Sequence, residues 1–215
     1  QVHTDAVQAI GKIPVDVEDL GVNLLSLSAH KFYGPKGVGA NYVRRRTRLD
    51  NFVHGGAQEQ NRRAGTENIA AIVGMGEAAE IAKRDHQKNS DGITKLTNRL
   101  RNGLRGKIED ICENGHSEYI DPGTLSISFK SVSGEMLLMR LDMEGICASS
   151  GSACASGSVE PSHVLAKLGI PPEVAQSTVR FSVGITNTEE QIDETIQKVT
   201  EIVAELRSTR NSSWV

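Results

Sequence analysis

Lys31 is the residue of this chain best placed to serve as a reactive amine that forms a Schiff base. Residues 22–28 (VNLLSLS) are predicted to form a short, mostly apolar strand, and Gly34, Pro35 and Gly37 predict the turn that stops it. Open α/β sheets bind ligands just past such strand ends, where a partly desolvated lysine becomes a usable nucleophile. The alternative is a solvated lysine beside a turn, and the local sequence leaves both open.

Cys154 is the second candidate, because it lies in a run of small residues at 149–158 (SSGSACASGS). Side chains this small cannot fill a core, which predicts an accessible thiol on a loop that can enter a site and leave it. A buried structural cysteine is the alternative. Cys112 and Cys147 each have an apolar neighbour and are predicted to be core or half-buried thiols. Three cysteines without a C-x-x-C pair argue against a disulfide framework and against a four-ligand zinc site.

Asp5, Gln8 and Arg180 have side chains that could bind a ring cofactor and an anion. A carboxylate at the end of a first strand can keep a pyridine nitrogen protonated, and an amide one turn later can reach a ring hydroxyl. The alternative for Asp5 is a helix N-cap. Arg180 is predicted in the middle of a half-buried strand at 178–183, where a guanidinium needs an anion. A substrate carboxylate and an internal salt bridge would both satisfy it.

The elements that would hold these residues begin with three short strands in residues 1–48, split by glycine turns, of which the last lies at 38–44. A polar loop with several glycines follows at 54–68, and loops of that length are more often functional than structural. Thr66 is predicted to cap a helix that starts near Asn68. The apolar face of that helix is predicted to consist of Ile69, Ile72, Val73, Gly76, Ala79, Ile81 and Ala82.

A second helical stretch is predicted at about 93–104, and residues 88–92 (KNSDG) are either a break or the polar face of one long helix. A long connecting helix marks a boundary between domains, so the pattern predicts one domain at 1–84 and another at 85–215.

The second half of the chain has the pattern of a small α/β unit. Strands are predicted at 125–129 and 178–183, and helices at 134–141 and 162–168. A last helix opens with a capping box at 188–191 (TEEQ). Its buried face is predicted to carry Ile192, Ile196, Val199, Ile202, Val203 and Leu206.

The composition is that of an ordinary globular protein, with 38% hydrophobic and 24% charged residues among 215. The net charge of −3 gives no strong attraction to nucleic acid or to an anionic membrane, and the basic run at 44–48 is interpreted as a solvated loop rather than a phosphate-backbone site. No stretch approaches the ~20 apolar residues needed to span a bilayer, and no charged start leads into an apolar secretory region. A cytoplasmic protein without nucleic-acid or membrane partners is therefore predicted.

Six segments together resemble the cysteine desulfurases of the NifS/IscS type, a branch of the pyridoxal-phosphate (PLP) enzymes related to class V aminotransferases. They are DAVQA at 5–9 with GK at 11–12, SAHKFYGPKG at 28–37, GGAQE at 55–59, RAGTEN at 63–68, SSGSAC at 149–154 and RFS at 180–182. The segments occur in the family's order and cover essentially the whole chain. The resemblance implies an α/β fold, the C-terminal portion of a fold-type I PLP-dependent transferase. Residues 1–84 would be a remnant of the large cofactor domain, and residues 85–215 the small domain that carries the cysteine loop.

The resemblance also implies how PLP would be held. Lys31 would form the Schiff base with the cofactor, Asp5 would pair with the pyridine nitrogen, and Gln8 would approach the ring hydroxyl. Ser28 and His30 would bind the phosphate.

The remaining roles implied by the resemblance concern the substrate and the partners. Thr66 would reach the phosphate of the cofactor in the partner subunit of a homodimer, and Arg180 would hold the carboxylate of L-cysteine. Cys154 would attack the substrate sulfur to give a persulfide and leave alanine. That sulfur would pass to an acceptor or scaffold protein in iron-sulfur cluster assembly or a thiolation pathway.

The family's cofactor site includes an earlier stretch that has no counterpart before Gln1, with further phosphate donors and an aromatic ring that stacks on the pyridine. The first part of the cofactor domain is therefore expected outside this sequence, and association with another chain or copy is predicted. The alternatives are a selenocysteine lyase, another class V enzyme, or a catalytically incomplete fragment that acts through protein contacts.

Overall fold

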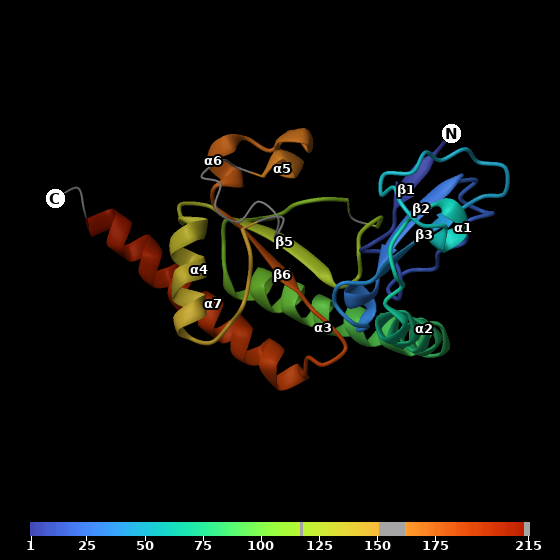
Figure 1. Ribbon diagram of the computed structural model, residues 1–215. Coiled ribbons are helices and arrows are strands. Elements are labelled where there is room, and N and C mark those ends of the chain that lie inside the picture. The colour runs from blue at the N-terminus through green and yellow to red at the C-terminus, as the bar shows by residue number, and fades with distance from the viewer. Residues whose placement is uncertain (117, 151–161, 213–215) are drawn as a thin grey trace. The chain divides into compact units, whose positions relative to one another are not determined.

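The computed structural model describes residues 1–116, 118–150 and 162–212, which belong to two compact units, Gln1–Ser90 and Asp91–Val215 (Figure 1). The boundary predicted at 84/85 coincides with the end of helix α2 (Ile69–Arg84), whereas the division between the units falls inside the next helix, α3 (His86–Lys107). Each unit has its own three-stranded sheet.

The first unit is built on strands β1 (His3–Asp5), β2 (Leu24–Ser28) and β3 (Gly39–Val43), in that order across the sheet. β1 runs parallel to β2, and β3 pairs with β2 in the antiparallel sense. The extended runs predicted at 22–28 and 38–44 are thus confirmed, with slightly shorter strands. Leu25 of β2 lies in a small core with Ala6 and Val22, on the face of the sheet opposite to its polar side chains.

Three helical elements complete this unit: the 3-10 helix η1 (Ala29–Phe32) directly after β2, the one-turn helix α1 (Gln58–Asn61) and α2. The cap predicted for α2 was wrong by two residues. Asn68, not Thr66, is the N-cap, because its Oδ1 accepts a hydrogen bond of 3.2 Å from the backbone N–H of Ala71.

The apolar face predicted for α2 was also wrong, except at Ala82, which packs against the core. Its isoleucine and valine side chains are exposed, and the only α2 residue among the described ones that is fully buried is Ala78. The face that packs against the rest of the unit is formed by Met75 and by small residues, which periodicity of large apolar side chains does not reveal. The exposed members are Ile69, Ile72, Val73 and Ile81.

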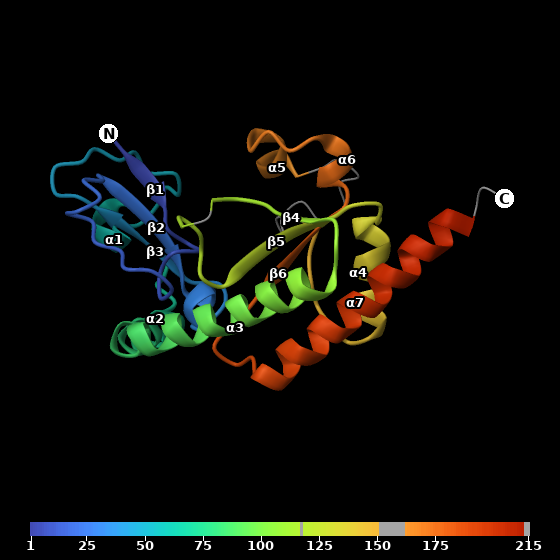
Figure 2. The same cartoon turned by 180° about the vertical axis from the view of Figure 1, so that it is seen from behind.

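The second unit contains strands β4 (Ile111–Glu113), β5 (Thr124–Phe129) and β6 (Thr178–Ser182), all antiparallel, with β5 in the middle. Helices α3, α4 (Gly134–Met143) and α7 (Glu189–Ser212) pack on one face, where alternate residues of β5 enter a large core. Helices α5 (His163–Lys167) and α6 (Pro172–Ala175) lie on the other side of β5 and β6 (Figure 2). The β5 residues in the core are Leu125, Ile127 and Phe129.

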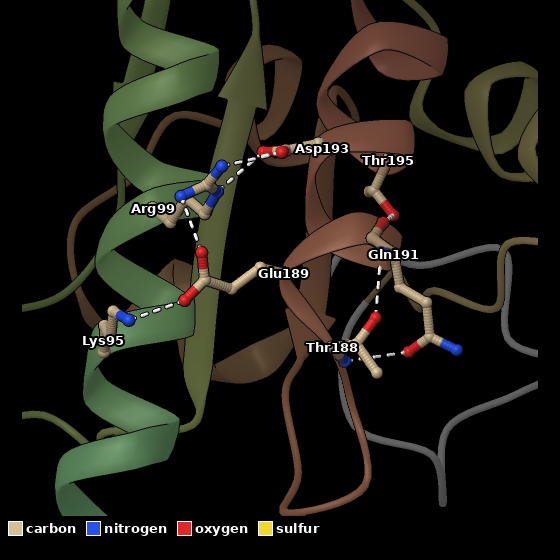
Figure 3. A network of polar contacts seen from close by, with 7 residues as sticks. All are labelled: Lys95, Arg99, Thr188, Glu189, Gln191, Asp193 and Thr195. Carbon is tan, nitrogen blue, oxygen red and sulfur yellow. Dashed lines mark hydrogen bonds and ion pairs between the residues drawn. The ribbon is translucent and has the colours of Figure 1, made fainter.

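The capping box and the buried face predicted for helix α7 are both confirmed. The backbone N–H of Gln191 donates to Thr188 Oγ1 at 3.3 Å, and that of Thr188 donates to Gln191 Oε1 at 3.1 Å, which is a capping box (Figure 3). Every residue predicted for its buried face packs in the core, Leu206 partly. Residues 88–92 turn out to be part of α3, and the interruption comes earlier, at Asp85. Among the residues described, no helix combines the length and hydropathy that a bilayer span requires.

Candidate active site

The carboxyl ends of β1 and β2 lie at one edge of the first unit's sheet, and candidate residues lie at both strand ends. Asp5 ends β1 and Ser28 ends β2, and the parallel register pairs Asp5 with Ser26. Because side chains alternate between faces, His3, Asp5, Ser26 and Ser28 point to the same side. His3 Nε2 and Ser26 Oγ share a hydrogen bond of 2.9 Å on that face. The sequence prediction did not include these two residues, although their spacing of two from Asp5 and Ser28 was a usable signal.

Lys31 lies in η1, immediately beyond this edge. Ala29 and Phe32, three residues apart, are 0% and 3% exposed and anchor the helix in the core. With three residues per turn, the two residues between these anchors point away from the core. His30 is exposed and Lys31 is half-buried, and His30 Nδ1 shares a hydrogen bond of 2.8 Å with Ser28 Oγ. The structure thus joins Ser28 to His30 and presents Lys31 beside them.

Asp5, the last residue of β1, and Gln8, three residues later, are both exposed. Asp5 Oδ1 accepts a hydrogen bond of 2.9 Å from the backbone N–H of Val7, so this residue does begin a turn, as the N-cap alternative expects. A carboxylate has a second oxygen, so this contact leaves it able to accept a further proton donor. Gln8 Oε1 accepts a hydrogen bond of 3.1 Å from Lys12 Nζ.

Thr66 lies exposed in the loop before α2. Gln58 Oε1 holds this loop by accepting a 3.1 Å hydrogen bond from the N–H of Gly65. Within the described part of the chain, no hydrogen bond or ion pair links Thr66 to the segment 28–31. These contacts therefore do not test the predicted role of Thr66 toward a second subunit.

Arg180 occupies the centre of β6 in the second unit. Its backbone pairs with Ser126 of β5 on one side and with Ser149 on the other, where Ser149 N donates to Arg180 O at 3.0 Å and Arg180 N donates to Ser149 O at 2.6 Å. Its Nε is buried without a hydrogen-bond partner among the described residues, which also supply no ion pair to it. A buried, unpartnered donor on a cationic side chain is suited to an anion such as a carboxylate.

The cysteine predictions have mixed outcomes. Cys154 lies outside the described residues. Cys112 and Cys147 are both exposed, so the expectation of core or half-buried thiols was wrong. Their apolar neighbours Ile111 and Ile146 do pack against the core, but adjacent side chains of an extended chain point to opposite sides. The same packing that buries each isoleucine therefore exposes the next residue.

Comparison with known proteins identifies the family of the chain. Residues 1–195 match the family described as Aminotransferase class-V. The chain belongs to the class V aminotransferase family. It is 47% identical over 206 residues to a protein of Dictyoglomus turgidum named cysteine desulfurase IscS, and 46% identical over 206 residues to one of Azotobacter vinelandii named cysteine desulfurase NifS. Each match covers 96% of this chain, and 52% and 51% of the relative. This class V aminotransferase chain thus spans about half the length of the curated relatives it matches.

Solved structures show the same fold. A NifS-like protein aligns with a TM-score of 0.84 and 38% identity over 94% of this chain and 52% of its own. The NifS-like protein of Rickettsia africae aligns with a TM-score of 0.85 and 30% identity over 94% and 53%. The expected fold class is therefore confirmed, a mixed α/β structure corresponding to about half of a fold-type I, NifS-like protein of the class V family.

Proposed function

We propose that this chain provides the Lys31 and Cys154 machinery of a PLP-dependent cysteine desulfurase, which converts L-cysteine to L-alanine and retains the sulfur on Cys154. The observation that carries the proposal is the shared strand edge, where Asp5 and Ser28 end two parallel strands and Lys31 follows the second. The relatives named cysteine desulfurase support the choice of reaction.

The donor set at this edge fits PLP. Ser28 and His30 offer a hydroxyl and an imidazole to a phosphate, and the Asp5 carboxylate offers an acceptor to a protonated pyridine nitrogen. Gln8 would approach the ring hydroxyl, and the amine of Lys31 would hold the cofactor's aldehyde carbon. When bound, PLP supplies an electron sink next to the substrate's α-carbon.

Side chains of this chain would bind the substrate, move the proton and accept the sulfur. Arg180 would hold the substrate carboxylate through its guanidinium, and Lys31 would move the α-proton as base and acid. The Cys154 thiolate would form a bond to the substrate sulfur as the carbon–sulfur bond breaks. L-Cysteine and the thiol would thereby become L-alanine and a persulfide, with no external oxidant. A thiol on a loop can then pass the sulfur to an acceptor thiol.

The same proposal includes the assembly. Thr66 would reach the cofactor phosphate in the partner of a homodimer, and the sulfur acceptor would be a separate protein in iron-sulfur cluster assembly or a thiolation pathway. A cytoplasmic location belongs with this proposal.

Cofactor binding gives the first test. The purified chain is mixed with PLP, freed of unbound cofactor, and its absorbance recorded near the visible edge before and after borohydride reduction. We expect a retained band and a reduced adduct on the Lys31 peptide by mass spectrometry, both lost in Lys31→Arg, which keeps the charge. Lys36→Arg, an exposed neighbour, is the matched control and should behave as wild type.

The reaction gives the second part of that test. Cys154→Ser should keep the absorbance band and lose sulfide and persulfide formation from L-cysteine, whereas unchanged sulfide release would remove Cys154 from the mechanism. A chain that retains no cofactor after soaking would favour the fragment that acts through protein contacts. A preference for L-selenocysteine over L-cysteine would favour the lyase alternative.

A further inference from the structure

The face of α2 that packs against the Lys31 segment contains two small residues, Gly74 and Ala78, at its closest contacts. Ala78 is 8% exposed and lies in one core cluster with Ala29 and Phe32, the two anchors of η1. Gly74 lies one turn before Ala78 on the same face of the helix. Met75 also packs against this cluster, whereas the isoleucine and valine side chains of α2 are exposed. At Gly74 and Ala78 the contact depends on the close approach of small residues.

At this contact, backbones and small side chains approach as closely as their atoms allow. A Cβ added to Gly74 would lie 2.7 Å from Pro35 Cγ and 3.3 Å from Pro35 Cδ. A Cβ added to Gly34 would lie 3.1 Å from Ala78 Cβ and 3.0 Å from Ala29 Cβ. Normal carbon contacts are about 3.5–4.0 Å, so no methyl group fits between α2 and the turn without displacing one of them.

The turn at 33–35 is tied to η1 and cannot absorb such a displacement locally. The backbone N–H groups of Tyr33 and Gly34 both donate to the carbonyl of Ala29, the latter at 2.9 Å. The ring of Pro35 is fixed to the backbone, so it cannot swing aside as a long side chain would. A push on Pro35 is therefore transmitted to the helix that carries Lys31.

We propose that Gly74 and Ala78 are positioning residues for Lys31, which set how far its amine stands from the strand edge that ends at Ser28. This inference rests on the proposed role of Lys31 as the reactive amine, because positioning matters only for a residue that reacts. Neither residue touches the reacting atoms; both act through Pro35 and the η1 anchors.

The first test compares Gly74→Ala with Gly76→Ala. Both replace a glycine of α2 whose φ is not positive, but a Cβ at position 76 meets nothing within 4 Å. The reactivity of Lys31 toward trace acetic anhydride is measured by mass spectrometry relative to Lys167, which is exposed on α5 in the other unit. We expect Gly74→Ala to change the ratio about threefold, because displacing the turn changes the surroundings of the amine, and Gly76→Ala to leave it unchanged.

A second pair of variants provides the test if Gly74→Ala does not fold. Ala78→Gly removes the methyl that faces Gly34, and Ala79→Gly makes the same change at an exposed position. Both should lower the melting temperature through helix propensity, but only Ala78→Gly should alter the Lys31 ratio, by about twofold. An unchanged ratio in Gly74→Ala and Ala78→Gly, or equal changes in both controls, would overturn the proposal and leave these residues a purely structural role.

The readout separates this inference from the proposed function. If wild type retains no PLP, the proposed function fails, yet the acylation ratio still reports whether α2 positions the amine. If wild type retains PLP, Lys31→Arg loses it, and the acylation ratio is the same in every α2 variant, the proposed function is supported and the positioning role is contradicted.

Discussion

Two buried threonines of the second unit differ in whether their hydroxyl group is hydrogen-bonded. Thr97 on α3 is 1% exposed, and its Oγ1 has no partner among the residues described. Thr178 on β6 is 2% exposed, and its Oγ1 lies 2.7 Å from Ser128 Oγ and 3.2 Å from the carbonyl oxygen of Val174, to which it donates. A buried hydroxyl without a partner keeps its full desolvation cost, whereas a bonded one recovers it.

Valine at each position should therefore have opposite effects on the free energy of unfolding. Thr97→Val replaces an unpartnered hydroxyl by a methyl of similar size, and should be neutral or stabilise by up to about 1 kcal/mol. Thr178→Val leaves Ser128 with one partner fewer, and should cost about 1–3 kcal/mol. Urea denaturation of both variants measures the difference. Equal losses would show that the Thr97 hydroxyl has a hydrogen bond after all.

At the level of single residues, the motifs in the sequence predicted which side chains gather at the strand edge. Asp5 ends β1 and Lys31 follows β2, as expected, because strand ends and turn residues are encoded locally. Exposure was harder to predict. The thiols of Cys112 and Cys147 are exposed because their isoleucine neighbours occupy the core, and which of two adjacent residues turns inward is decided by partners distant in sequence.

At the level of elements, α3 and α7 are joined by a network of charged side chains (Figure 3). Arg99 Nε pairs with Asp193 at 2.7 Å and Arg99 Nη1 with Glu189 at 3.0 Å, while Lys95 pairs with Glu189 at 2.5 Å. The hydrogen bond from Arg99 lowers the pKa of Asp193, and the one from Lys95 lowers the pKa of Glu189. Both carboxyl groups thus bind protons less readily in the folded than in the unfolded chain.

This network predicts a loss of stability in acid. A carboxyl group with a lowered folded-state pKa contributes its stability above the unfolded value and loses it as pH falls through the folded value. The ordinary values are 4.5 for Glu189 and 3.8 for Asp193, so the urea midpoint should hold from pH 7 to about 5 and fall below 4.5. Arg99→Gln should flatten this fall.

The matched control for that experiment is Lys167→Gln, which removes an exposed positive charge from α5. It should leave the acid dependence as in wild type. If Arg99→Gln and Lys167→Gln give the same pH profile, the α3–α7 ion pairs contribute nothing measurable, as holds for many exposed pairs.

Helices α7 and α2 show how far local sequence predicts an element. The capping box and the apolar stripe of α7 were both correct, since large side chains at helical spacing enter a large core. For α2 the same reasoning selected the wrong face, because its contact is made by Gly74 and Ala78 against a tight turn. Close approach of small residues depends on the partner surface, and periodicity of large side chains carries no information about it.

At the level of the whole molecule, the two units have very unequal cores. Among the described residues, the second unit has one cluster of seventeen buried apolar residues, whereas the first has two clusters of three. Buried apolar area is the main source of stability, so the second unit should open less often than the first. The first unit also exposes many large apolar side chains: Val2, Ile13, Leu20, Tyr33, Leu49, Phe52, Val53, Ile69, Ile72, Val73 and Ile81.

Limited trypsin digestion should therefore remove the first unit before the second. Exposed arginines at 45–48 and 62–63 flank a loop with little regular structure, and we expect early cuts there, followed by a resistant fragment that starts after Arg84 or Lys88. Survival of a fragment from the first unit would contradict this order.

A ligand that binds only the folded first unit must raise the free energy of opening that unit. Added PLP should therefore slow the cuts before Arg84 and leave later ones unchanged if the strand edge at Asp5, Ser28 and Lys31 is its site. Lys31→Arg should remove that protection. Protection that persists in the variant would mean that PLP stabilises the unit without its proposed covalent partner, and equal slowing of all cuts would mean that it acts on trypsin.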